Sequence, residues 1–107
     1  MKKIKSVEPL KNWNVSNVTT FESAFDSDNS ITSLAGLENW NVSSAKSMFA
    51  MFYGLSNLTD ATAIADWNVT SSINFTKMFQ NCNKVTLPIF TNLPGTWDSN
   101  GTYIPTT

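Results

Sequence analysis

The sequence has no histidine and a single cysteine, Cys82, among its 107 residues. Without histidine the chain cannot form a Ser–His–Asp or Cys–His catalytic system, nor a metal site with histidine ligands. One cysteine excludes an intrachain disulfide framework, and we expect Cys82 to be a small buried apolar residue rather than a reactive thiol. The four glycines form no glycine-rich phosphate loop. These absences argue against an enzyme, and no metal or cofactor is predicted.

Charged residues are also scarce, at 14% of the chain with a net charge of −1. Binding to nucleic acid requires a concentrated basic surface that neutralises phosphates, so nucleic acid is not an expected partner. No apolar run approaches the roughly 18 residues of a membrane span, so no membrane insertion is expected. The hydrophobic residues, 41% of the chain, are sufficient for the core of one domain.

The N-terminal segment leaves the cellular compartment open. MKKIKSVEPLKNW carries the lysines of a secretory leader but no apolar segment behind them. If Met1 is native, we expect a cytoplasmic protein. If the chain is a fragment of a larger protein, we expect a cell-surface or secreted one.

A 27-residue repeat organises the rest of the chain. Trp13, Trp40 and Trp67 recur at this period, and each is followed at the twelfth position after it by a phenylalanine. Units of such a repeat bury a core only by stacking, so we expect the three tryptophans to form a buried ladder. Further matched columns hold Leu10, Leu37 and Ile64; Asn14, Asn41 and Asn68; Val15, Val42 and Val69; and Phe25, Phe52 and Phe79.

Apolar spacing within each unit predicts a short helix. Phe21, Ala24 and Phe25 fall at positions i, i+3 and i+4, which share one helix face. The same spacing recurs from Met48 and from Phe75. A short strand is favoured at residues 31–34, 58–61 and 85–87 because Ile, Val and Thr occur there, although apolar residues at every third position leave a tight turn open.

These elements predict an α/β repeat solenoid of three 27-residue strand–loop–helix units. Residues 1–9 would form an N-terminal cap and residues 10–95 the three-repeat solenoid. Residues 96–107 would form a C-terminal capping hairpin, since Asn100-Gly101 suits the positive φ angles of a tight turn. All three parts belong to a single domain.

Three segments, NWNVSNVTTFESAF, NWNVSSAKSMFAMF and DWNVTSSINFTKMFQNCNKVT, resemble repeats of the BspA-like leucine-rich-repeat family of bacterial surface proteins. That family carries a similar Trp-Asn-x-Ser…Met-Phe run, and GTWDSNGTYIPTT is similar to the hairpin that often ends its arrays. The resemblance covers about residues 10–105. It implies a leucine-rich-repeat-like solenoid and a non-catalytic, adhesion-type module that docks a protein or glycan partner through one solenoid face.

An alternative function remains open: a small intracellular or phage-encoded protein that binds and inhibits a single protein partner. In either case we expect the binding site along one sheet face. A solvated face, or a threonine ladder that stabilises neighbouring strands, is the simpler interpretation of the same residues. The candidate binding residues are the row Thr32, Thr59 and Thr86, the neighbouring Asp60 and Lys84, and the tyrosines Tyr53 and Tyr103.

Overall fold

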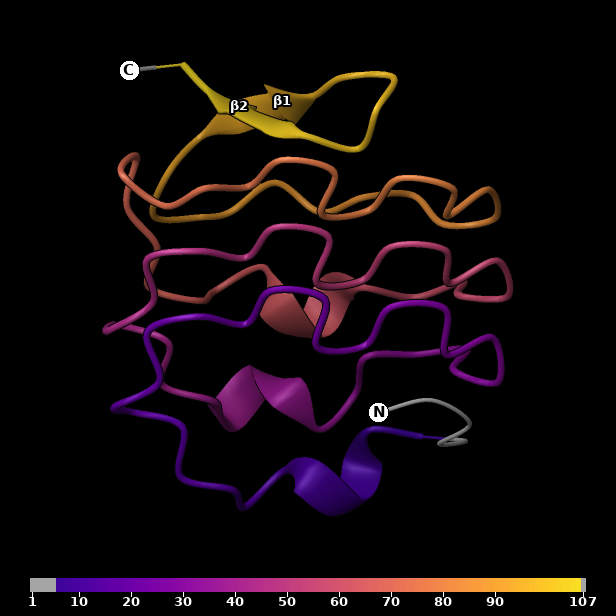
Figure 1. Cartoon of the computed structure of the whole chain (residues 1–107), viewed down its shortest axis with the longest axis horizontal. Coiled ribbons are helices and arrows are strands. Elements are labelled where there is room, and N and C mark those ends of the chain that lie inside the picture. Colours follow the sequence, from indigo (N-terminus) through magenta and orange to yellow (C-terminus); the bar gives the residue numbers. More distant parts are fainter. Residues whose placement is uncertain (1–5, 107) are drawn as a thin grey trace.

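The computed structural model describes residues 6–106 and contains few regular elements (Figure 1). Three 3-10 turns, η1 (Glu8–Leu10), η2 (Leu37–Asn39) and η3 (Thr62–Ile64), precede two strands, β1 (Gly95–Trp97) and β2 (Tyr103–Pro105). Within residues 6–106 there is no α-helix, and the only sheet is this antiparallel pair. The predicted leucine-rich-repeat-like α/β solenoid of strand–loop–helix units is therefore wrong. Nor is any helix in this range long or apolar enough to cross a membrane.

Turns of chain lie side by side in three layers between the two ends of the molecule (Figure 1). We define the first layer as residues 14–36, the second as residues 41–63 and the third as residues 68–91. Single-residue parallel bridges connect the layers in two rows. One row joins Thr20 to Ser47 and Ser47 to Asn74, and the other joins Ser33 to Asp60 and Asp60 to Thr86.

Short polar side chains at the bridge residues explain why no strands extend from them. The Thr20 hydroxyl accepts from the amide two residues later at 3.2 Å, and the Asp60 carboxylate does the same at 3.0 Å. This side-chain bond bends the backbone into a turn directly after the bridge. The strands predicted at 31–34, 58–61 and 85–87 are therefore wrong, and each is reduced to one bridge residue.

A chain of tight turns replaces the predicted helices. The amide of Ala24 donates to Phe21 O at 3.0 Å, and the amide of Asp28 donates to Phe25 O at 3.2 Å. Within these turns, Ser23 and Ser27 have left-handed φ angles of 56° and 63°. A left-handed residue at every fourth position prevents an α-helix. Consecutive turns thus produce the i, i+3, i+4 spacing, and the helices predicted from Phe21, Met48 and Phe75 are wrong.

The same backbone conformation recurs in the other layers. It points every second amide toward the following layer. Left-handed residues occur again at Ala50 and Lys77, and at Gly54 and Asn81. These amides donate to carbonyl groups of the following layer. The resulting row of hydrogen bonds joins two layers in the same way that backbone hydrogen bonds join two strands of a sheet. Amides of Phe21, Ser23, Phe25 and Ser27 donate to Ser47, Phe49, Met51 and Tyr53, and amides of Met48, Ala50, Phe52 and Gly54 donate to Asn74, Thr76, Met78 and Gln80.

Aromatic stacks fill the space between layers. The rings of Phe25 and Phe52 have centroids 5.5 Å apart and those of Phe52 and Phe79 have centroids 5.0 Å apart. Trp40 and Trp67 are stacked with centroids 6.5 Å apart. Trp13, however, is 53% exposed, so the expectation of three buried tryptophans is wrong for the first one.

The hairpin β1–β2 lies over the third layer (Figure 1). Trp97 pairs with Tyr103 across the two strands, and the carbonyl of Gly101 accepts from the Phe79 amide at 3.1 Å. Of the two turn residues singled out from the sequence, only Gly101 has a positive φ, 72°. At the other end η1 begins in the predicted N-terminal cap, residues 1–9, and ends one residue beyond it at Leu10. Residues 1–5 of that predicted cap fall outside the described residues.

Candidate binding surface

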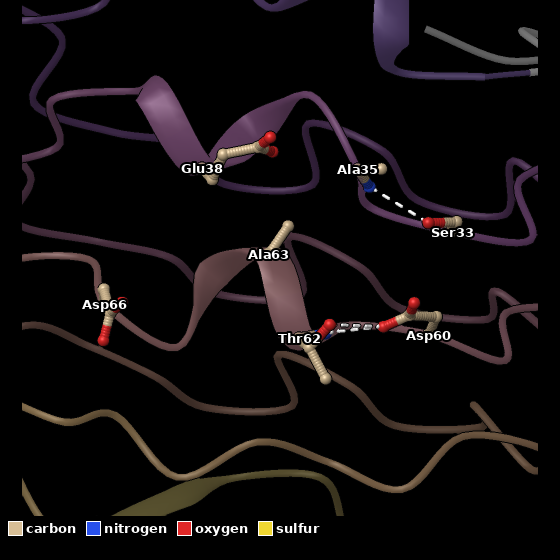
Figure 2. A pocket seen from close by; sticks show the side chains of 7 residues that line it. All are labelled: Ser33, Ala35, Glu38, Asp60, Thr62, Ala63 and Asp66. Atoms are coloured by element: carbon tan, nitrogen blue, oxygen red, sulfur yellow. Dashed lines mark hydrogen bonds between the residues drawn. The ribbon is translucent and has the colours of Figure 1, made fainter.

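A polar depression of about 310 Å³ lies beside η2 and η3 (Figure 2). Glu38 projects from η2, while Asp60 and Asp66 lie on opposite sides of η3. The depression is thus formed where the first and second layers and the turns η2 and η3 present polar side chains to solvent. Its lining consists of Ser33, Ala35, Glu38, Asp60, Thr62, Ala63 and Asp66, with no cationic side chain among them.

Backbone amides hold the Glu38 carboxylate in place. Glu38 Oε1 accepts from the Gly36 amide at 2.6 Å. The amides of Glu38 itself and of Gly36 lower the pKa of the Glu38 carboxyl, and Lys11 adds a smaller electrostatic contribution. Lys11 itself forms an ion pair with Glu8 at 2.9 Å. Glu38 is therefore an oriented, ionised carboxylate at neutral pH.

Asp60 is positioned by Thr62, two residues later. Its Oδ1 accepts from the Thr62 hydroxyl at 2.7 Å and from the Thr62 amide at 3.0 Å. These bonds, the hydroxyl first, lower the pKa of the Asp60 carboxyl. On the other side of η3, Asp66 Oδ1 accepts from the Thr91 hydroxyl at 2.7 Å. One carboxylate oxygen of each aspartate thus accepts a hydrogen bond. The charged residues that line the depression are all acidic.

The oriented carboxylates at the depression can accept hydrogen bonds from cationic groups. Within residues 6–106, no three Cys, Asp or Glu side chains gather closely enough to hold a metal ion. The single thiol has no role here, since burial raises the pKa of Cys82 to about 11 and its Sγ donates to Phe52 O at 3.0 Å. Ionised carboxylates that are already oriented fit ammonium or guanidinium donors.

Comparison with known families shows to which family the chain belongs. Residues 1–101 match the family model described as "Mycoplasma protein of unknown function, DUF285". The chain belongs to this family. The match spans nearly the whole DUF285 chain, and it is not a match to a BspA-like or leucine-rich-repeat family. No similar curated protein and no similar solved structure was found for this DUF285 chain.

The residues expected to form the binding face of the DUF285 chain lie in several places. Asp60 lines the depression. Thr59 lies against Thr32, whose carbonyl accepts from the Thr59 amide at 2.9 Å and from its hydroxyl at 3.1 Å. Thr86 bridges to Asp60 rather than to Thr59. Because the step from Asp60 to Thr86 is one position shorter than the repeat period, the expected threonine row is out of register in the third layer.

The remaining candidates lie outside the depression. Lys84 donates to Asn57 Oδ1 at 3.1 Å, and the hydroxyl of half-buried Tyr53 accepts from Asn81 at 3.3 Å. Tyr103 is only 2% exposed and donates to the Leu93 carbonyl, so its interpretation as a surface residue is wrong.

Sequence reasoning missed Ser33, Glu38, Thr62 and Asp66. Glu38 and Asp66 occupy no common repeat column, because one lies two residues before a tryptophan and the other lies one residue before. A usable signal exists for Asp60: a short polar residue followed two positions later by a hydroxyl residue is typical of a side-chain-capped turn. That signal would have drawn attention to Thr62.

Proposed function

We propose that this DUF285 chain is a non-catalytic binding module that docks a protein partner through the acidic depression beside η2 and η3. The observation that carries the proposal is the pair Glu38 and Asp60, whose carboxylates are oriented and kept ionised by hydrogen bonds to neighbouring backbone and hydroxyl groups. Pre-oriented groups lose little conformational freedom on binding, so more of the interaction energy appears as affinity.

The chemistry of the lining favours a basic side chain of a protein over a glycan. All charged groups at the depression are carboxylates, and a volume of about 310 Å³ accommodates a lysine or arginine side chain. No aromatic side chain lines the depression to stack against a sugar ring. A protein that presents Lys or Arg therefore fits the depression better than a glycan does.

The resemblance of the Trp-Asn-x-Ser…Met-Phe segments to BspA-like surface proteins supports an adhesion-type role at a bacterial surface. The second candidate is an intracellular or phage-encoded inhibitor of one protein partner. The same acidic depression serves either role, so the source of the partner decides between them.

The test compares Glu38→Gln, Asp60→Asn and the double variant with Asp98→Asn, a matched control whose aspartate is exposed in the turn between β1 and β2. Each immobilised protein is exposed to host extracellular extract and to bacterial lysate, and captured proteins are quantified by mass spectrometry. We expect a basic partner that wild type and Asp98→Asn retain and the double variant loses. Capture from host extract favours adhesion, and capture from lysate favours the inhibitor. Equal capture by all variants would refute a role for the depression.

A further inference from the structure

The first layer ends the described stack with a row of backbone acceptors. In the second layer, the carbonyl groups of residues 47, 49, 51 and 53 accept from amides of the first layer. Their counterparts one repeat earlier belong to Thr20, Glu22, Ala24 and Asp26. No donor within residues 6–106 reaches these four carbonyl oxygens. Such a row is the main-chain equivalent of an exposed sheet edge, to which another chain can add.

Trp13 lies one residue before the first layer and lacks the contacts of its equivalents. Trp40 and Trp67 are 6% and 2% exposed, whereas Trp13 is 53% exposed. The indole nitrogens of Trp40 and Trp67 donate to carbonyl groups of the preceding turn at 2.9 and 2.8 Å. Among residues 6–106, no acceptor meets the Trp13 indole nitrogen.

The cover of a tryptophan comes from the layer that precedes it. Trp40 packs against Phe21 and Phe25 of the first layer, with ring centroids 5.8 and 6.2 Å away. By the same geometry, a segment added before the first layer would place side chains at the Phe21 and Phe25 positions over Trp13. Aromatic residues at those two positions would complete the contact that the chain already makes internally.

Charge at this edge selects a basic segment. The side chain of Glu22 is exposed, and that of Asp26 is half-buried with one oxygen engaged by the Ser27 hydroxyl at 2.7 Å. Both belong to the acceptor row itself. A segment that bears lysine or arginine between its aromatic residues would neutralise them.

We propose that the N-terminal edge, defined as the carbonyl groups of Thr20, Glu22, Ala24 and Asp26 together with Trp13, docks an extended segment of a partner protein. That segment runs parallel to residues 20–26, donates alternate backbone amides, and carries two aromatic side chains with a basic one between them. The proposal is independent of the acidic depression and concerns a second surface of the molecule.

The probe is a synthetic peptide of residues 72–84 with Cys82→Ser, because this segment has the required Phe75, Lys77 and Phe79 and contains no tryptophan. It is titrated into the full-length protein while tryptophan emission is followed. We expect a saturable blue shift and reduced iodide quenching, both absent in Trp13→Phe. N-methylation of the Phe75 and Phe79 amides should weaken binding by about tenfold or more, since two hydrogen bonds are lost.

Matched peptides and variants decide the outcome. A peptide N-methylated at Ile73 and Asn83, which flank the donor row, should bind like the parent peptide. The protein variant Glu38→Gln/Asp60→Asn should bind the parent peptide as tightly as wild type does. Equal affinity for all the peptides, or an unchanged emission, overturns the proposal. A peptide of residues 1–5 that displaces the probe also overturns it, because the occupant would then be the chain's own N-terminal segment.

Discussion

The two ends of the layered region differ in how they are covered. At the C-terminal end, the hairpin supplies a carbonyl from Gly101 to the Phe79 amide and a hydroxyl from Thr102 to the Lys77 amide at 2.9 Å. Trp97 packs edge-to-face with Phe79, with ring centroids 5.1 Å apart. At the N-terminal end, the carbonyl groups of Thr20, Glu22, Ala24 and Asp26 meet no donor within residues 6–106.

This difference shows whether the burial of a tryptophan depends on its neighbours along the sequence or on the layer packed against it. The segment Asn-Trp-Asn-Val-Ser occurs at residues 12–16 and again at residues 39–43. Nevertheless, Trp13 is 53% exposed and Trp40 is 6% exposed. Identical neighbours along the chain therefore do not determine burial. Contacts with the preceding chain do: within residues 6–106, these supply aromatic cover and a hydrogen-bond acceptor to Trp40 but not to Trp13.

The largest effect should come from removing a covered tryptophan. Trp67→Ala deletes an indole that stacks on Trp40 and donates to Leu37 O, and leaves a cavity. We expect the free energy of unfolding to fall by about 3–5 kcal/mol. Trp13→Ala should lower it by less than about 1 kcal/mol, since the side chain is half in water. Urea unfolding followed by circular dichroism measures both, and similar losses for the two variants would show that Trp13 is covered in solution.

A smaller loss is expected when the hairpin is prevented from docking. A Cβ added at Gly101 would collide with the backbone of Phe79 and Gln80, and Gly101 also requires its φ of 72°. Gly101→Ala should therefore lower the free energy of unfolding by about 2–3 kcal/mol. Ser99→Ala, at an exposed residue of the same turn, is the control and should stay within about 0.5 kcal/mol of wild type. A Gly101→Ala protein as stable as this control would mean that the C-terminal end is not closely covered.

Sequence periodicity identifies which residues form the core but not the backbone that places them. Spacing alone aligns Phe25, Phe52 and Phe79, and these residues stack in one column. The spacing favours a helix only ambiguously, because an α-helix and a chain of tight turns both bring i, i+3 and i+4 together. The residues that separate the two cases, Ser23 and Lys77, adopt positive φ without being glycine or asparagine, so their identity carries no signal.

Part of the missing information is present in a second column. Gly54 and Asn81 both have positive φ, and glycine and asparagine are the residues that adopt it most readily. The column that also contains Ser27 therefore indicates a break in each supposed helix. The depression is harder to predict, because it depends on side chains from neighbouring turns, and of its lining only Asp60 is among the candidates from the sequence. Glu38 and Asp66 come together through the stacking of η2 and η3, which periodicity does not describe.

Relief of backbone strain should give a small gain in the third layer. Lys77 is exposed and has a φ of 58°, which costs a residue with a Cβ about 1–2 kcal/mol. Lys77→Gly should raise the free energy of unfolding by about 0.5–1 kcal/mol after the entropy cost of glycine is subtracted. Lys46→Gly removes the same charge at a position without positive φ and should lower stability by a similar amount. Thermal melts of the two variants shifting in the same direction would contradict the strain argument.

The last prediction concerns Cys82, which lies at the contact between the second and third layers. Its effect on stability should be the smallest, but its effect on thiol reactivity should be large. Burial raises the pKa of the Cys82 thiol from 9.0 to about 11. At pH 8 its thiolate fraction, and hence its alkylation rate, should be about a hundredfold lower than in the urea-unfolded chain.

The sign of the pH dependence follows from the same shift in pKa. Folding favours the protonated thiol, so its contribution to stability is complete below pH 9 and is lost as the pH rises toward about 11. Cys82→Ala should remove this component. Because the thiol contacts Phe52 O rather than either end, Trp13→Ala should label with iodoacetamide as slowly as wild type, whereas Trp67→Ala should label faster. If folded wild type were labelled as rapidly as the urea-unfolded chain, the second and third layers would separate readily in solution. The layers between the two ends would then be no better protected than the N-terminal end.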